Sequence, residues 1–418
     1  MKSENWRGER AIVLLALAVA AIVAYLPTLR QPFIEDDYPN LAQSAILGAP
    51  AAWRELAASV FRLRATSTWM MYAAWHAFGL HPAPYYALAI ALHVLNTWLV
   101  YALGRWPALG HRVSAWAALF FAVYEGHQEA VMWFSASNEL LQFLFGVGAF
   151  LCWLIFLERR RWAWYAGALV LFVLALLSKE SAVVFALLFA LPLKRRRAPW
   201  LLPFLALAAV AAYSVYGSRG SSFRFQDNSF VLSARFWLVW PLNMARLLWF
   251  WGALGIAAAV WKHAKVVALG LAWAGISLLP YSFLTYSTQI PSRQLYLASA
   301  GVAWIVGAGF VAVSDAPLRS RLRWVFPVIA AILVLHNVGY LWIKKRRQFL
   351  ERAAPTEQLI AFARRTNGPI YVRCFPRNHY IAEEAVHLGA GKAPSDLVWD
   401  AADARARGAA ATFCYQRK

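Results

Sequence analysis

The sequence predicts an all-α polytopic membrane protein, and three observations lead to this prediction. Hydrophobic residues make up 61% of the 418-residue chain and charged residues only 15%, whereas roughly a quarter of the residues in soluble domains are charged. The mean hydropathy is +0.49. Apolar stretches of about the length that crosses a bilayer recur as far as residue 343. Most of the chain is therefore not a water-soluble globule.

We expect about eleven membrane-spanning helices, because apolar stretches of spanning or nearly spanning length alternate with short polar segments. The first stretch is long enough to remain as an uncleaved anchor rather than serve as a cleaved signal peptide. The expected spans are 10–29, 84–104, 113–125, 139–157, 162–178, 181–193, 199–217, 236–258, 266–284, 295–313 and 324–343.

Basic residues are distributed in a pattern that indicates the orientation of the protein in the membrane. The 41 Lys and Arg residues outnumber the 20 Asp and Glu residues, for a formal net charge of +21. They lie mostly in short clusters between apolar stretches, so we expect no nucleic-acid partner. The clusters fall on alternate loops, and the positive-inside rule makes that side cytoplasmic. They comprise Arg105 with Arg112, 159–161, 194–197, Lys262 with Lys265, and Arg319 with Arg321 and Arg323.

The loops on the opposite side carry few bases, and the longest of them, residues 30–83, contains the acidic stretch IEDDYPN. We expect this loop to face the periplasm or an equivalent lumen. Its segments 42–63 and 67–79 are expected to form helices that lie along the membrane interface, where a lipid-borne substrate can be met. The other expected outer loops are 126–138, 178–180, 218–235 and 285–294.

Residues 344–418 regain charge and are expected to form a small C-terminal α/β unit after a membrane unit at 1–343. PIYVRCF and AATFCYQ are typical of strands, and NHYIAEEAVHLG is typical of a helix. An odd number of spans places this unit outside, whereas the cluster KKRR at 344–347 favours the inside. Cys374 and Cys414 can form a disulfide only in an oxidising compartment, and two free thiols are the alternative.

Charged side chains are costly at membrane depth, so each one there is a candidate functional residue. Each candidate also has a structural interpretation. Asp36 and Asp37 could simply be solvated residues at the start of a loop. Lys179 and Glu180 could pair with each other and cap a tight turn, and His127 could be an isolated histidine at the membrane interface. By the expected topology, four groups lie at the height of Arg64 on the outer face. They are Glu35, Asp36 and Asp37; Glu125, His127, Glu129 and Glu139; Lys179 and Glu180; and Arg293.

Carboxylates and bases beside a membrane-bound substrate suit the transfer of a sugar from a lipid phosphate. The phosphate is already a good leaving group, so the acid catalyst of a glycosidase is dispensable. One carboxylate suffices as general base on the acceptor hydroxyl. Cations then stabilise the departing phosphate, and these are either Arg and Lys or a divalent metal such as Mg²⁺ or Mn²⁺.

The order and spacing of several motifs resemble the GT-C superfamily of polytopic glycosyltransferases. The resemblance is to its protein O-mannosyltransferase-like branch and to the bacterial branch that uses dolichyl- or undecaprenyl-phosphate sugars. Three positions depart from the family pattern, Ala65, Ser137 and Ser292. The motifs are FIEDDY at 33–38, the run from Arg64 through Gly79, His93 and Asn96, EGHQEAVMWFSASNELL at 125–141, LLSKESAVV at 176–184 and SRQLYLAS at 292–299.

This resemblance implies an inverting glycosyltransferase of a bacterial inner membrane with its active site on the periplasmic face. The donor would be a polyprenyl-phosphate sugar, and the acceptor a hydroxyl of a glycan, lipid or protein. Asp36 would be the general base, and Asp37 would orient the acceptor or bind a metal. The residues expected to face the lipid phosphate or shape the cavity are Arg64, Lys179, Glu180, Arg293, Tyr296, His127 and Glu129. A metal, if used, would be held by Asp37, His127 and Glu129; family members differ in metal use, so this point stays open.

Two other classes of function stay open. A transporter or flippase of a lipid-linked saccharide would hold polar residues near the bilayer midplane, often in paired halves of the chain, whereas here they gather at the outer face. A non-catalytic membrane scaffold would act through residues 350–418. Consumption of the donor lipid, rather than its movement alone, distinguishes an enzyme from a transporter.

Overall fold

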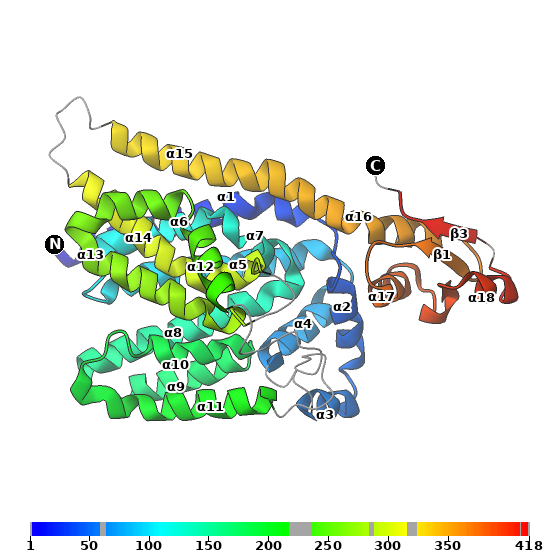
Figure 1. Ribbon diagram of the computed structural model, residues 1–418, viewed down its shortest axis with the longest axis horizontal. Helices are drawn as coiled ribbons and strands as arrows, with labels where there is room; N and C mark the ends of the chain where they lie inside the picture. The colour runs from blue at the N-terminus through cyan, green and yellow to red at the C-terminus, as the bar shows by residue number, and fades with distance from the viewer. Residues whose placement is uncertain are drawn as a thin grey trace.

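The chain folds into an elongated helical bundle with a small α/β unit at one end, as the computed structural model shows (Figure 1). The structure describes residues 2–58, 64–216, 236–283, 288–315, 324–409 and 411–416. Parts of the expected features lie outside these ranges: the outer loop at 218–235, residues 285–287 of another, the end of the interfacial segment at 59–63, and the cluster of Arg319, Arg321 and Arg323.

Most of the long helices overlap the expected spans, but the expected span 236–258 is divided between α12 and the first half of α13. At the expected span 181–193 the chain instead forms a 3-10 turn, Glu180–Val184, and the short helix α10 (Phe185–Leu188). The long helices are α1 (Lys2–Tyr25), α5 (Pro82–Ala102), α6 (Gly110–Val123), α8 (Ser137–Arg159), α9 (Trp162–Leu176), α11 (Leu202–Tyr216), α12 (Phe236–Leu248), α13 (Trp251–Leu278), α14 (Tyr296–Ser314) and α15 (Val325–Tyr340).

The described residues contain seven helical segments that are long and apolar enough to cross a membrane, and Trp162–Leu176 is a shorter apolar helix. Apolar side chains are also exposed on the outside of the bundle, for example Trp237 and Trp261. In water such a surface would be costly, whereas lipid solvates it. The chain is therefore an integral membrane protein, as predicted, and the count of about eleven spans stays a prediction.

Helix α13 folds back on itself near its middle. The backbone of His263 leaves the helical conformation there (φ −128°, ψ 34°). A Cβ placed on Gly252 would lie 3.3 Å from Val302 of α14, and one placed on Gly270 would lie 2.5 Å from the carbonyl oxygen of Gly301, the preceding residue of α14. Because two positions so far apart in α13 pack beside consecutive residues of α14, the two halves of α13 run in opposite directions. The second half overlaps the expected span 266–284, whereas the first half shares the expected span 236–258 with α12.

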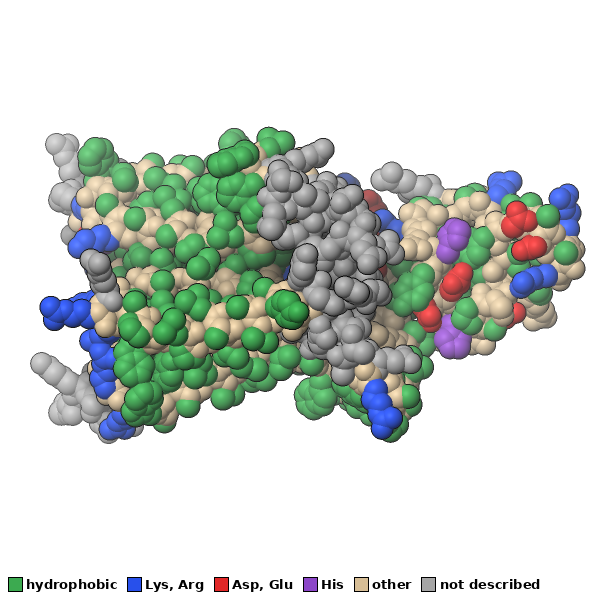
Figure 2. All heavy atoms as spheres, turned by 60° about the horizontal axis from the view of Figure 1, so that its bottom comes forward, with side chains coloured by type: hydrophobic (Ala, Val, Ile, Leu, Met, Phe, Trp, Pro, Cys, Tyr) green, Lys and Arg blue, Asp and Glu red, His purple; other side chains and the backbone are tan. Residues whose placement is uncertain are grey.

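Charge distinguishes the two ends of the bundle. Most of the Lys and Arg side chains seen on the bundle in Figure 2 gather at the end away from the C-terminal unit. There Arg105 pairs with Glu158 at 3.0 Å and Arg112 with Asp315 at 2.8 Å. The positive-inside rule predicts that this end is cytoplasmic.

The acidic stretch lies at the opposite end with three short helices, α2 (Asp37–Ile46), α3 (Pro50–Ala58) and α4 (Ala65–Phe78) (Figure 1). The short helix expected at 67–79 is α4.

The C-terminal unit contains a three-stranded parallel sheet with the strand order β2-β1-β3. The expected strands and helix are present, and the sequence reading missed β2 and α18. Helix α16 continues α15 through a single π turn at Leu341–Lys345, so no break in the helix marks the predicted boundary at 343, which stays a prediction. The elements are α16 (Arg346–Ala363), β1 (Ile370–Cys374), α17 (His379–Ala390), β2 (Leu397–Val398), α18 (Ala401–Ala406) and β3 (Ala411–Cys414).

The C-terminal unit lies at the same end of the bundle as the acidic stretch. Helix α17 packs against α2, and the hydroxyl of Tyr38 donates a hydrogen bond to Glu357 at 2.9 Å. The cluster KKRR at 344–347 therefore belongs to this end and is an exception to the alternation of basic loops. Of the two alternatives for the cysteines, the structure has the disulfide, which joins Cys374 in β1 to Cys414 in β3.

Candidate functional site

Asp36 is the carboxylate of the acidic stretch that is free to meet a substrate. It precedes α2, its side chain is exposed, and that side chain makes no hydrogen bond or ion pair with any other residue that the structure describes. The preceding residue, Glu35, has a left-handed backbone (φ 48°), which few non-glycine residues adopt.

Asp37, in contrast, is buried and fully engaged. Its Oδ1 accepts hydrogen bonds from the backbone N–H of Ser135 at 2.8 Å and from the Ser135 hydroxyl at 2.5 Å, and its Oδ2 accepts one from the N–H of Ile34 at 3.0 Å. Burial raises the pKa of Asp37 to about 6, although these hydrogen bonds oppose the shift. Asp37 therefore ties the first loop to the segment before α8 and fixes the chain next to Asp36.

Three arginines surround the acidic stretch, and they come from different parts of the chain. Glu35 accepts from Arg352 at 2.5 and 3.2 Å and pairs with Arg377 at 2.8 Å. Arg293, in the turn before α14, has its Nη1 3.6 Å from Glu129, and the Nη1 of Arg352 lies at the same distance from the other oxygen of that carboxylate. These 3.6 Å contacts are looser than a charge-assisted hydrogen bond.

The indole of Trp133 lies beneath two of these guanidinium groups. The Cζ atoms of Arg293 and Arg352 are 4.9 and 4.6 Å from its ring centroid, within cation–π range. The indole N–H donates to the carbonyl oxygen of Ile34 at 3.2 Å. Trp133 thus holds the two cations close to the loop segment that carries the acids.

The charges around Asp36 act on its pKa in opposite directions. Partial burial and then the neighbouring Glu35 carboxylate raise the pKa of Asp36 above its ordinary value. The guanidinium groups of Arg293, Arg352 and Arg377 lower it. Asp36 and Arg293, which the sequence reading placed at one height, are therefore close enough to interact electrostatically.

A second charge cluster contains the other sequence-predicted cations. Lys179 does not pair with its neighbour Glu180 but donates to Glu139 of α8, while Arg64 binds Glu180 through two nitrogens at 3.2 and 3.0 Å. Arg293 lies close enough to Glu139 for its charge to act on that carboxylate. The two clusters therefore adjoin, and the role of Arg64, Lys179 and Glu180 toward a lipid phosphate stays a prediction.

His127 and Tyr296 lie inside the protein and have no exposed surface. The Nε2 of His127 is 2.6 Å from the hydroxyl of Ser299, and its ring centroid is 4.5 Å from that of Tyr296. The Tyr296 hydroxyl is 2.7 Å from Nδ1 of His93. Both residues therefore pack α5, α6 and α14 together at the base of the site, and a direct contact with substrate stays a prediction for them.

The residues expected for a metal are not grouped as a ligand set. Among the residues that the structure describes, no three His, Cys, Asp or Glu side chains are placed to hold a metal ion. Asp37 uses both carboxylate oxygens for hydrogen bonds, His127 is buried beside Ser299, and Glu129 faces two arginines. We therefore derive no chemical step through a metal.

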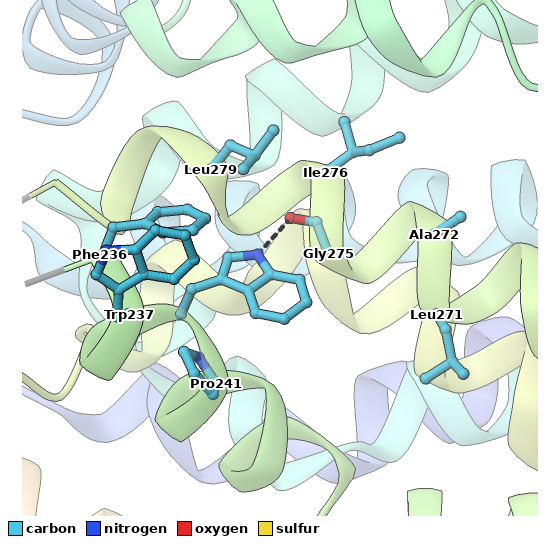
Figure 3. A pocket seen from close by; sticks show the side chains of 9 residues that line it. Phe236, Trp237, Pro241, Leu271, Ala272, Gly275, Ile276 and Leu279 are labelled. Atoms are coloured by element: carbon cyan, nitrogen blue, oxygen red, sulfur yellow. Dashed lines mark hydrogen bonds between the residues drawn. The ribbon is translucent and has the colours of Figure 1, made fainter. Parts of the chain in front are cut away.

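An apolar groove of about 610 Å³ lies between α12 and the second half of α13 (Figure 3). One of its walls is fixed by the indole of Trp240, which donates to the carbonyl oxygen of Gly275 at 3.0 Å. The groove offers hydrocarbon contact and no ionisable group. Its lining residues are Phe236, Trp237, Trp240, Pro241, Leu271, Ala272, Gly275, Ile276 and Leu279.

The sequence reading missed Arg352 and Arg377 as members of the site. Both belong to the C-terminal unit, and neither falls within a motif that signals function. One indirect indication of their role was available in the sequence. If the C-terminal unit lies on the outer side, as the number of spans predicts, its arginines can reach the acidic stretch.

Three comparisons place the chain among known proteins. Residues 66–216 match the model of the dolichyl-phosphate-mannose-protein mannosyltransferase family. The chain is similar to the protein O-mannosyl-transferase Tmtc1 of Drosophila melanogaster, with 28% identity over 198 residues, which are 42% of this chain and 22% of that protein. The matched part thus spans about a fifth of this relative's length.

Two solved structures share the fold at low sequence identity. ArnT from Cupriavidus metallidurans, bound to undecaprenyl phosphate, aligns at a TM-score of 0.52 with 13% identity, over 94% of this chain and 90% of that one. The oligosaccharyltransferase AglB from Archaeoglobus fulgidus, in complex with an inhibitory peptide and a dolichol-phosphate, aligns at 0.54 with 13% identity, over 92% and 64%. The resemblance to GT-C glycosyltransferases that the motifs predicted is confirmed.

Proposed function

We propose that this chain, whose fold and family match are those of GT-C membrane glycosyltransferases, transfers a sugar from a polyprenyl-phosphate donor to an acceptor hydroxyl. The observation that carries the proposal is the position of Asp36, an exposed carboxylate without an ion pair among the described residues. It lies among three arginines, just before α2, at the end of the bundle opposite the basic loops (Figure 1). Two proteins of the same fold have been solved with polyprenyl phosphates, as the preceding subsection reports.

In the proposed reaction Asp36 accepts the proton of the acceptor hydroxyl as the oxygen attacks the anomeric carbon. The bond between that carbon and the phosphate oxygen breaks, and its electron pair leaves with the phosphate. Because attack comes from the face opposite the leaving group, the configuration at the anomeric carbon inverts. The products are a glycoside, a protonated Asp36 and a polyprenyl phosphate.

The leaving phosphate gains negative charge, which Arg293 is placed to offset. Its guanidinium group is held over Trp133 and only loosely by Glu129 at 3.6 Å, so it can turn toward a phosphate oxygen at low cost. Arginine suits this task because its planar donors bind phosphate through two hydrogen bonds. Asp37 keeps the backbone of the first loop in place, since its hydrogen bonds to Ser135 and Ile34 anchor both sides of the turn.

The sidedness of the reaction follows from the charge distribution. The basic loops cluster at one end of the bundle (Figure 2), and α2, which follows Asp36, lies at the other end beside a unit that contains a disulfide (Figure 1). Disulfides persist in oxidising compartments. These features support a site on the outer face of the membrane, and we propose the periplasmic face of a bacterial inner membrane.

Reconstitution in proteoliposomes tests the proposal against the transporter alternative. The assay supplies a polyprenyl-phosphate donor whose sugar is radiolabelled, together with a mixture of candidate acceptors. It measures how much donor remains and in which leaflet of the bilayer the donor lies. An enzyme consumes the donor and releases polyprenyl phosphate, and the Asp36→Asn variant does not. Movement of intact donor between leaflets without consumption would identify a flippase instead.

A further inference from the structure

The C-terminal unit supplies charged groups to the candidate site. Arg352 of α16 and Arg377, which follows β1, both bind the carboxylate of Glu35, the residue before Asp36. The Glu35 side chain is only 11% exposed and that of Arg352 22%, so water screens this ion pair weakly. Neither arginine lies in the segment 66–216 that matches the family.

We propose that Arg352 and Arg377 are positioning residues, which hold Glu35 in its left-handed conformation and thereby present Asp36 to the substrate with a balanced charge around it. This inference rests on the proposed function of Asp36 as general base. By this inference the C-terminal unit contributes to catalysis, because it supplies the arginines that position Glu35 and Asp36.

The backbone geometry explains why Glu35 must be held. A left-handed conformation costs a non-glycine residue on the order of 1–3 kcal/mol and persists where the surroundings fix it. Two arginines of the C-terminal unit form ion pairs with the side chain of Glu35. The N–H of Ile34 donates a hydrogen bond to Asp37, which fixes the backbone before and after Glu35. The turn places the carboxylates of Asp36 and Glu35 apart, one toward solvent and one toward the arginines.

The charge balance explains why both arginines matter. An unpaired Glu35 would repel a negative charge on Asp36 and compete for Arg293. With Arg352 and Arg377 bound to it, its carboxylate is neutralised, and Arg293 remains for the substrate. The charged and titratable groups that face Asp36 are Glu35 and Asp37 from its own segment, Arg293 from the turn before α14, Arg352 from α16, and Arg377 and Tyr380 from the C-terminal unit.

Two substitutions that remove opposite charges test the inference. Arg352→Gln leaves Glu35 less compensated, so the pKa of Asp36 should rise by about one unit, whereas Glu35→Gln should lower it by a similar amount. The double variant should return toward the wild-type value, and Arg352→Lys should restore it in part. Arg347→Gln is the matched control, because Arg347 lies on the same helix, its side chain is 77% exposed, and its ion pair among the described residues is with Glu351 at 3.6 Å.

The pKa of Asp36 is read directly from the carboxylate band in infrared difference spectra against the Asp36→Asn variant. The acid limb of kcat/KM against pH gives a second reading in the full-length protein. Opposite shifts for the two single variants support the inference. Equal pKa values in wild type, Arg352→Gln and Glu35→Gln would overturn it, even if activity falls. If wild type transfers no sugar, the proposed function fails, while the infrared shifts still decide the positioning role.

Discussion

Replacing Asp36 by Asn separates the chemistry of the site from its structure. The side chain is exposed and has no hydrogen-bond partner among the described residues, so the substitution should change the free energy of unfolding by less than about 0.5 kcal/mol. Asn keeps the shape of the side chain but cannot accept a proton. Loss of a general base lowers the rate by about 10²- to 10⁴-fold, which corresponds to about 3–5 kcal/mol in the activation barrier.

The assay measures kcat/KM with a radiolabelled polyprenyl-phosphate sugar, together with thermal unfolding in the same detergent. Asp315→Asn is the matched control, because Asp315 is an exposed acid at the opposite end of the bundle, paired with Arg112. It should leave the rate unchanged. An Asp36→Asn variant that keeps more than half of the wild-type rate would refute the assignment of the base. A variant that loses its activity only because it unfolds would refute the claim that Asp36 is structurally free.

Three further predictions concern the fold around the site. The folded-state pKa of Asp37, about 6, lies above its ordinary value of 3.8, so folding favours the protonated carboxyl. As the pH rises from about 4 to about 6, the wild-type protein should therefore lose up to about 3 kcal/mol of stability relative to the Asp37→Asn variant, as measured by chemical unfolding. Gly301→Ala should lower the free energy of unfolding by about 1–3 kcal/mol, because the added methyl group would clash with the carbonyl oxygen of Gly270. The control Gly339→Ala places its methyl group in open space and should be neutral or slightly stabilising in thermal unfolding. Under denaturing conditions the protein should take up one maleimide per chain before reduction and three after it, because the Cys374–Cys414 disulfide protects two of its three cysteines; uptake of three before reduction would contradict the disulfide.

Much of the fold is readable from the sequence because a membrane imposes a strong pattern. Apolar runs long enough to cross lipid locate the helices, and the turn at His263 occurs between two such runs, beside Lys262 and Lys265. The span expected at 181–193 forms only a short helix, since tertiary packing rather than length decides the conformation of a short apolar run.

The candidate site is only partly readable, and the reason is physical. Asp36 and Arg293 were recognisable as candidates because charged side chains are costly at membrane depth and therefore usually have a function there. The different roles of Asp36 and Asp37 depend on which carboxylate meets Ser135, and this is a matter of tertiary structure. Arg352 and Arg377 reach Glu35 only because the C-terminal unit folds back onto the first loop.

His127 shows what a sequence motif leaves open. Its motif drew attention to it as a substrate or metal ligand; the structure shows it fully buried and packed against Tyr296, and a contact with substrate stays a prediction. A histidine in an apolar chain stands out in the sequence whether it binds substrate or fills the core. The burial of His127 depends on the packing of α6 against α14, which the sequence alone does not give.

The most direct measurement is a structure of the protein in a lipid nanodisc with a bound polyprenyl phosphate. The account predicts that the phosphate lies against the guanidinium group of Arg293, with Asp36 facing the position that the anomeric carbon would occupy. A phosphate bound at the basic end of the bundle, near Arg105 and Arg112, would contradict it.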